Sequence, residues 1–234
     1  MYKELAKYYD IIYRWKDYAM EAEKVYQIIH DYRKSDGNDL LDAACGTGEH
    51  AKYLQDYFKI TGVDSSPYML EIARKKVKKA SFIKGDMRNF KLNKQFDAIV
   101  CLFSAIAHLK DYNKLEQAIS NFSVHLKKGG VLIIEPFVLP KAFTVGEPHA
   151  LYVDDPELKI ARMNISRRRN GIASIHFHFL IANRKKIEYL NEKHELALYE
   201  TGKFLSIMKK YNLQSKFTQN GLMKNRGLYI GIKK

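Results

Sequence analysis

Cysteine and long apolar runs are scarce in this 234-residue sequence, and each shortage excludes a class of protein. Only two cysteines occur, Cys45 and Cys101, which are too few for a disulfide framework and fit a reducing compartment such as the cytoplasm. No run of about 18 apolar residues is present, so we expect no membrane span. Residues 1–10 are polar and aromatic, which leaves no apolar core for a signal peptide.

Acidic residues are also few: 26 Asp and Glu stand against 40 Lys and Arg, and the formal net charge is +14. This excess favours anionic partners such as RNA or nucleotide-linked substrates, although most lysines fall in short clusters typical of solvated helix faces. The densest cluster, Arg167 to Arg169, precedes Asn170-Gly171 and predicts a basic hairpin turn. No internal repeat or low-complexity linker occurs, so we expect one domain with a sizeable core.

Strand and helix patterns alternate over the first part of the chain. Apolar runs at 39–41, 59–63, 81–84, 96–102 and 131–135 predict buried strands, and amphipathic stretches at 18–32, 49–57, 67–78 and 114–125 predict helices. Strands that alternate with helices of this length indicate right-handed crossovers and a parallel sheet. The expected fold is therefore α/β, a doubly wound, mostly parallel Rossmann-like sheet with helices on both faces.

The pattern changes after Pro136. Residues 158–166, 172–182 and 186–199 alternate β-branched or aromatic residues with polar ones, which predicts antiparallel strands. A helix at 201–211 and a strand at 228–232 would return the chain to the main sheet. We therefore expect an inserted antiparallel β-sheet after the fifth strand rather than a separable domain.

The stretch LLDAACGTGEHA, residues 40–51, connects the first strand to the following helix. Gly46, Gly48 and Ala51 match the spacing of a dinucleotide-binding turn. Asp42 argues against a dinucleotide, because its carboxylate would face a pyrophosphate at close range. S-adenosylmethionine carries a sulfonium and an α-ammonium and no phosphate, so an acid in this turn favours it, while the glycines still allow the backbone to approach the ligand.

Two further aspartates follow the next two strands. Asp64, in ITGVDSS, can accept hydrogen bonds from both ribose hydroxyls, and Asp86, in IKGDMRNF, can accept from the adenine amine beside Met87. A single aspartate after a strand is more often a helix cap or a turn former. Three in register after three successive strands are more specific, and they favour S-adenosylmethionine as the cofactor.

These motifs resemble the class I S-adenosylmethionine-dependent methyltransferases, and more narrowly the N-methyltransferases that act on nucleotide-linked deoxyaminosugars. The resemblance covers nearly the whole chain, in YDIIYRWKDYAMEA, LLDAACGTGEH, GVDSSPYML, GDMRNF, LFSAIAHL, HLKKGGVLIIEPF, HELALYE and NRGLYIG. It implies a single methyltransferase domain over residues 1–234. Within that domain it implies a helical lid over residues 1–35 and an antiparallel insertion over residues 136–200 that covers the acceptor site.

The resemblance also implies the residues of the site. The implied cofactor-binding residues are Tyr9, Tyr13, Lys16, Asp42, Ala44, Cys45, Gly46, Gly48, Asp64, Ser65, Met69, Asp86, Met87 and Leu102. The implied acceptor-binding residues are Tyr13, Phe137, His178 and Arg226, with His108 close to the reacting amine and no metal. The departures from the family pattern lie towards the substrate: Phe137-Val138 replaces paired tryptophans, residues 220–225 lack the usual glycines, and the lid is shorter.

Methyl transfer from a sulfonium is a one-step displacement, so positioning can supply most of the acceleration without a nucleophilic side chain. His108 could take a proton from an ammonium acceptor, or it could only orient the substrate or cap a loop. Arg226 could anchor phosphates, or it could pair with an acid and hold the closing strand. His176 and His178 share a strand face, where we expect pocket lining or a subunit contact rather than a metal site.

Two other functions stay open at this stage. The net charge and Arg167 to Arg169 favour an RNA methyltransferase, but LFSAIAHL stands where base-amine methylating enzymes carry an Asn/Asp-Pro-Pro-aromatic motif. The other alternative is a cofactor-binding protein without catalysis. We expect a small-molecule acceptor, and the sequence leaves open whether the acceptor carries a phosphate. The sequence also leaves open the methylated atom, a nucleic-acid partner and a homodimer, and predicts no membrane partner.

Overall fold

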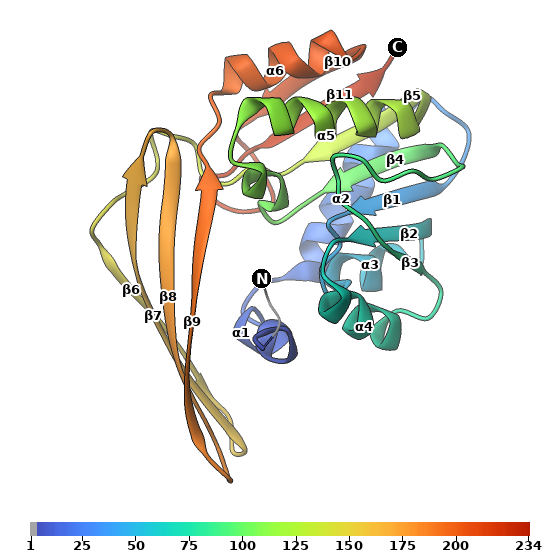
Figure 1. The fold of residues 1–234 in the computed structure, drawn as a ribbon. Helices are drawn as coiled ribbons and strands as arrows, with labels where there is room; N and C mark the ends of the chain where they lie inside the picture. The colour runs from blue at the N-terminus through green and yellow to red at the C-terminus, as the bar shows by residue number, and fades with distance from the viewer. Residues whose placement is uncertain (1–3) are drawn as a thin grey trace.

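The main sheet has seven strands in the order β10-β11-β5-β4-β1-β2-β3 in the computed structural model, which describes residues 4–234 (Figure 1). Its strands are β1 (Asp39–Ala43), β2 (Lys59–Asp64), β3 (Ser81–Lys84), β4 (Phe96–Cys101), β5 (Leu126–Ile134), β10 (Leu213–Thr218) and β11 (Leu228–Lys233). The first five run parallel, and β11 pairs antiparallel with β5 and β10. The predicted mostly parallel sheet is thus confirmed.

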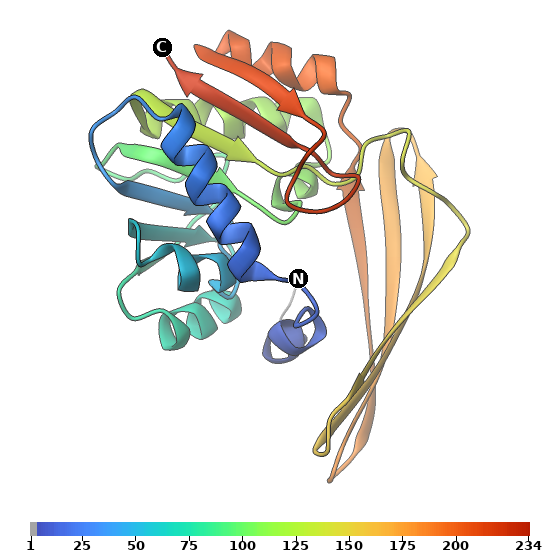
Figure 2. The same cartoon turned by 180° about the vertical axis from the view of Figure 1, so that it is seen from behind.

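Helices cover both faces of this sheet (Figures 1 and 2). The helices of residues 4–234 are η1 (Ala6–Tyr8), α1 (Tyr9–Ile12), α2 (Tyr18–Tyr32), α3 (Glu49–Leu54), α4 (Pro67–Lys76), η2 (Ala105–Leu109), α5 (Tyr112–His125) and α6 (Thr201–Lys210). Of these, α2, α3 and α4 pack on one face of the main sheet, and α5 and α6 pack on the other. Neighbouring residues of β1 point to opposite faces, so Leu40 packs with α2, α3 and α4, and Leu41 packs with α5 and α6. Within residues 4–234, no helix is long and apolar enough to cross a membrane.

A second sheet of four antiparallel strands, in the order β6-β7-β8-β9, stands beside one end of the main sheet (Figure 1). Its strands are β6 (Pro148–Asp154), β7 (Leu158–Arg169), β8 (Ile172–Asn183) and β9 (Ile187–Ala197). The expected hairpin turn between β7 and β8 is present, because both Asn170 (φ 49°) and Gly171 (φ 74°) adopt the left-handed conformation that such a two-residue turn requires.

Some element boundaries differ from the expectation. The helix α3 ends at Leu54 rather than Tyr57, because the chain turns there to bury Phe58. Lys128 to Gly130, expected as a connection, lies within β5. The strands β6 and β10 were not expected from the sequence. Val153 alone is buried in β6, so its sequence lacks the apolar alternation that would have marked a strand.

The amino-terminal segment connects the two sheets. Residues 1–3 of the expected lid lie outside the described residues, and α2 packs into the core of the main sheet through Ala22, Val25 and Ile29. By contrast, Leu5 just before η1, Tyr8 in η1 and Ile12 in α1 pack on the antiparallel sheet. On the other side of this segment, the Asp10 carboxylate accepts hydrogen bonds from Thr47 Oγ1 and Lys76 Nζ, each at 2.6 Å.

Candidate cofactor and acceptor site

A cavity of about 420 Å³ opens at the carboxyl ends of β1, β2 and β4, where parallel sheets bind ligands. Of the residues expected to bind the cofactor, it brings together Tyr9, Asp42, Ala44, Cys45, Gly46, Asp64, Ser65, Met69, Met87 and Leu102. Tyr18, Thr47, Glu49 and His50 line it as well. We call this the cofactor cavity.

The backbone of the glycine turn is left-handed at Ala44 (φ 63°), Gly46 (φ 55°) and Gly48 (φ 76°). No heavy atom lies within 4 Å of the position a Cβ would take on Gly46, so the backbone there is open to a ligand. Gly48 has another role. Its missing Cβ would approach the Cβ of Ala73 to 3.2 Å, so this glycine allows α3 and α4 to pack and does not line the cavity.

Two buried carboxylates face the cofactor cavity. Asp42 is 3% exposed, and burial, together with the charge of Asp64, raises its pKa to about 7. Asp64 accepts hydrogen bonds from the N–H groups of Gly46 (2.9 Å) and Ser66 (2.8 Å), which fix its carboxylate at the end of β2. Burial raises the pKa of Asp64 despite these bonds. A cationic ligand would stabilise both carboxylates in the ionised form, as expected for Asp42.

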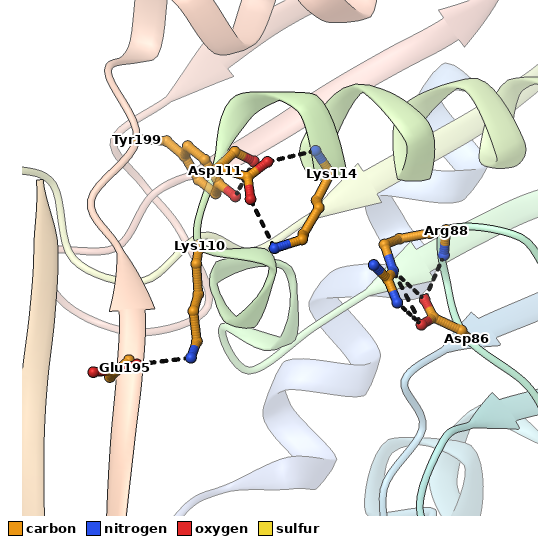
Figure 3. Close-up of polar contacts among 7 residues, drawn as sticks. All are labelled: Asp86, Arg88, Lys110, Asp111, Lys114, Glu195 and Tyr199. Atoms are coloured by element: carbon orange, nitrogen blue, oxygen red, sulfur yellow. Dashed lines mark hydrogen bonds and ion pairs between the residues drawn. The ribbon is translucent and has the colours of Figure 1, made fainter.

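A neighbouring cavity of about 350 Å³ shares Ala44, Asp64, Ser65 and Met87 with the cofactor cavity and extends past the end of β3. Both oxygens of Asp86 accept hydrogen bonds from Arg88 here, at 2.5 to 3.0 Å (Figure 3). The hydrogen bonds from Arg88 lower the pKa of Asp86, so its carboxylate is ionised at neutral pH. Each carboxylate oxygen has two lone pairs, so Asp86 can still accept a bond from an adenine amine.

Lys16 does not line the cofactor cavity. Its ammonium forms a buried ion pair with Glu21 and lies over the rings of Tyr18 (4.7 Å) and Phe103 (4.9 Å). Glu21 Oε2 also lies 2.8 Å from His50 Nε2. Lys16 thus stands behind the wall of the cavity and supports residues that line it.

A third cavity of about 200 Å³ lies between the main sheet and the antiparallel sheet, and we call it the acceptor cavity. Its walls include three of the expected acceptor-binding residues, Tyr13, Phe137 and Arg226. Tyr9, Phe103 and His108 line both this cavity and the cofactor cavity, so the two meet at these side chains. Tyr13, which was expected to contact both ligands, lines the acceptor cavity but not the cofactor cavity.

His178 does not reach the acceptor cavity. Phe177 and Phe179 of β8 face the interior, so His178 between them projects from the opposite face. There its Nδ1 lies 2.6 Å from the Tyr189 hydroxyl. His194 of β9 lines the acceptor cavity instead, because it pairs with Ile175 and shares the inward face. No group of three or more metal-binding side chains occurs among residues 4–234.

Two guanidinium groups border the acceptor cavity. Arg226 donates to Ser104 Oγ at 2.6 Å and lies over the rings of Phe103 (5.1 Å) and Phe137 (5.8 Å). Its charge also acts on the buried Glu135 carboxyl, where it offsets part of the rise in pKa that burial causes. Sequence reasoning missed Arg162 of β7, which lies over Phe177 (5.1 Å) and has a buried Nε without a hydrogen-bond partner in the described chain. The sequence feature that marks Arg162 is a cationic side chain two residues after Ile160, which places it on the inward face of β7.

His108 stands where all three cavities meet. Its Nδ1 is buried and has no hydrogen-bond partner among residues 4–234. Burial, together with the charges of His194 and Lys110, lowers the pKa of His108 to about 4. The ring is therefore neutral at physiological pH and has a lone pair available to a ligand.

Comparisons with known proteins agree with this geometry. A methyltransferase-domain family matches residues 40–130. The chain is 32% identical to a dTDP-3-amino-3,4,6-trideoxy-alpha-D-glucopyranose N,N-dimethyltransferase of Streptomyces venezuelae, over 97% of each chain. The crystal structure of DesVI from that organism superposes with a TM-score of 0.92 at 31% identity, over 98% of each chain. The structure of the amino pentose methyltransferase CalS10 from Micromonospora echinaspora, with S-adenosylmethionine bound, superposes with a TM-score of 0.85 at 28% identity, over 94% and 93% of the two chains.

Proposed function

Because the chain belongs to the class I S-adenosylmethionine-dependent methyltransferases, in the group that includes the dTDP-aminosugar N,N-dimethyltransferases, we propose that it methylates the amine of a nucleotide-linked aminosugar. The names of its relatives support this acceptor. The observation that carries the proposal is the acceptor cavity, where two guanidinium groups stand among aromatic rings beside the cofactor cavity.

S-adenosylmethionine is the cofactor of this enzyme family, and its sulfonium supplies the electrophilic methyl group. The cofactor cavity fits such a cation, because neither Asp42 nor Asp64 forms a salt bridge within residues 4–234 and both have raised pKa values. We expect Asp42 to face the positive charge and Asp64 to accept the ribose hydroxyls. Asp86 and Met87 would border the adenine in the neighbouring cavity.

Arg162 and Arg226 fit a phosphate-bearing acceptor. Each guanidinium can present two parallel N–H donors to a phosphate, and neither forms a salt bridge with an acid in the part of the chain that the structure describes. Phe103, Phe137 and Phe177 offer apolar faces for the base and the sugar. By contrast, the basic turn Arg167–Arg169 does not line the acceptor cavity, so the site gives no support to an RNA substrate.

The transfer itself needs positioning. The amine nitrogen forms a bond to the methyl carbon while the carbon–sulfur bond breaks, and holding these groups in line can contribute about 7 to 11 kcal/mol at best. His108, neutral at the junction of the cavities, would accept a hydrogen bond from the amine and so orient its lone pair. Tyr9 and Phe103 would hold the two ligands in contact.

The same proposal assigns roles to the outer parts of the chain. Residues 4–16 act as a lid, since they bridge the glycine turn and the antiparallel sheet, and the insertion over residues 136–200 covers the acceptor. A second copy of the chain would cover the exposed apolar side chains on the outer face of that sheet. Cys45 and Cys101 are both free and buried, which suits the cytoplasm we expect.

Binding of dTDP alone, measured by calorimetry, tests the acceptor. We expect Arg162→Ala and Arg226→Ala each to weaken dTDP binding at least tenfold, because hydrogen bonds between charged groups contribute about 1.5 to 3 kcal/mol. Lys224→Ala, at an exposed position of the same loop as Arg226, is the control with the same loss of charge. Affinity for S-adenosylhomocysteine should stay constant in all three. Unchanged dTDP affinity in both arginine variants would contradict a phosphate-bearing acceptor.

A further inference from the structure

A second histidine of the acceptor cavity is paired with a carboxylate. His194 and Glu192 lie two residues apart on β9 and share its inward face, and Glu192 Oε2 is 3.0 Å from His194 Nε2. Both are largely buried, with 9% and 19% of their side chains exposed. A carboxylate that accepts the Nε2–H of an imidazole fixes its tautomer, leaves the lone pair on Nδ1, and stabilises the ring once it is protonated.

The surroundings hold His194 beside His108. The ring centroids of the two histidines are 5.7 Å apart, and the ring of His194 forms a T-shaped pair with that of Phe177, with centroids 5.1 Å apart. Lys110, which follows η2, forms an ion pair with Glu195 at 2.7 Å and so ties the His108 segment to β9 (Figure 3). The ring contact with Phe177 and the ion pair between Lys110 and Glu195 therefore fix the separation of the two histidines.

The two histidines differ in what faces them. Among residues 4–234, the titratable or charged groups nearby are Glu192 on β9, His108 and Lys110 at η2, Tyr9 on α1, Tyr13 at its end, Arg162 on β7 and Arg226 before β11. His108 has no carboxylate partner in the described chain and is disfavoured as a cation by its burial. It can accept a hydrogen bond but cannot retain a proton at neutral pH. His194 has Glu192.

We propose that Glu192 and His194 form the proton-accepting pair of the acceptor cavity, which takes the proton that a substrate ammonium must lose before it is methylated. This inference rests on the proposed amine acceptor. The ammonium N–H bond breaks, its electron pair stays on nitrogen, and His194 becomes an imidazolium stabilised by Glu192. The nitrogen then bonds to the methyl carbon, and the electrons of the carbon–sulfur bond remain on sulfur. The imidazolium then releases its proton to solvent, so that His194 can take a proton from the new alkylammonium before a second transfer.

The pH profile of kcat/KM tests this pair, with dTDP-3-amino-3,4,6-trideoxyglucose as the acceptor. We expect His194→Asn to lower kcat/KM at pH 7 by about 100-fold or more, the usual contribution of general base catalysis. The deficit should shrink as the pH rises above the pKa of the substrate amine, where the amine is already neutral. Glu192→Gln should show a smaller deficit with the same pH dependence, and His30→Asn, at an exposed position of α2, should match the wild type.

A role limited to packing would lower kcat/KM by the same factor at every pH, and that result would overturn the inference. So would a full deficit in His108→Asn with none in His194→Asn. Binding of S-adenosylhomocysteine, measured in each variant, confirms that the cofactor cavity is intact. A wild-type enzyme that binds S-adenosylhomocysteine but methylates no aminosugar would overturn the proposed function, and this inference with it, before any variant is compared.

Discussion

Asp42 is the residue whose ionisation couples the cofactor cavity to pH. Its ordinary pKa is 3.8, and burial raises this to about 7 in the folded protein. Between these values the folded state binds a proton that the unfolded state has released. The contribution of the protonated group to stability is therefore present below about pH 4 and is lost as the pH rises to about 7. A bound cation reverses the preference of the folded protein for protonated Asp42, because it favours the ionised carboxylate.

S-adenosylmethionine binding should therefore release a proton near neutral pH. If Asp42 must be ionised, affinity should rise about tenfold between pH 6 and pH 8. Calorimetry in two buffers with different ionisation enthalpies measures the proton directly. Asp42→Asn should bind more weakly and should lose both the proton release and the pH dependence. A variant that keeps the same pH dependence as the wild type would show that another group is responsible.

Single residues were predictable where a motif placed them at the end of a strand. Asp42 and Asp64 face the cofactor cavity because parallel strands end at the same edge of the sheet. Arg162 was not predictable, because it becomes part of a site only when the antiparallel sheet stands beside the end of the main sheet. The two faces of β8 follow from alternation, but which face turns inward depends on contacts with the lid, and so His178 was misplaced.

At the scale of elements, the lid is held by two different kinds of contact. Leu5, Tyr8 and Ile12 pack on the antiparallel sheet by apolar burial, and the Tyr8 hydroxyl also donates to Glu188 Oε1 of β9 at 2.9 Å. Asp10 instead binds Thr47 and Lys76, which belong to the glycine turn and to α4. These bonds are the polar connection between the lid and the wall of the cofactor cavity.

Asp10→Asn should loosen this connection and leave the apolar contacts unchanged. An amide has the same shape, but it loses the charge that attracts Lys76 and one of the acceptor oxygens. We expect S-adenosylhomocysteine to dissociate several-fold faster from this variant than from the wild type. Stopped-flow measurement of the fluorescence of Trp15, the sole tryptophan of the chain, gives the dissociation rate. Asp31→Asn, at an exposed position of α2, is the control. An unchanged dissociation rate in Asp10→Asn would contradict a lid that gates the cofactor.

Fully buried strands and amphipathic helices were the easiest elements to predict. The strands β1, β2, β4 and β5 are apolar because both faces of the main sheet are covered, and their sequences were readily recognised. The helix α2 was predicted with its observed bounds, since its buried positions repeat every three to four residues. The exposed strand β6 carried no such pattern.

At the scale of the whole molecule, the antiparallel sheet has an exposed apolar face. The face opposite the acceptor cavity carries large apolar side chains that are more than half exposed: Tyr152, Met163, Ile165, Leu180, Ile187 and Tyr189. Their register places them on one face of four adjacent strands. An apolar patch of this kind typically marks an interface, and an isologous dimer would cover it with the same patch of a second chain.

We expect the wild-type protein to be a dimer by light scattering coupled to size-exclusion chromatography. Leu180→Lys should convert it to a monomer, because two lysines would then be buried unpaired across the two-fold axis or close to it. Arg184→Ala, at the exposed tip of the same sheet, should leave the dimer intact. A wild type that is monomeric at all concentrations would remove the reason for a second copy on this face.

The identity of the acceptor is the central claim, and a methyl-transfer assay tests it most directly. The enzyme and isotopically labelled S-adenosylmethionine are incubated with one acceptor in each of three parallel reactions. The acceptors are dTDP-3-amino-3,4,6-trideoxyglucose, the corresponding free aminosugar and total RNA, and the products are identified by mass spectrometry. We predict that label enters the amine of the dTDP-linked sugar, with much lower kcat/KM for the free aminosugar. Label in RNA alone, or equal kcat/KM for the free and the dTDP-linked aminosugar, would contradict the account.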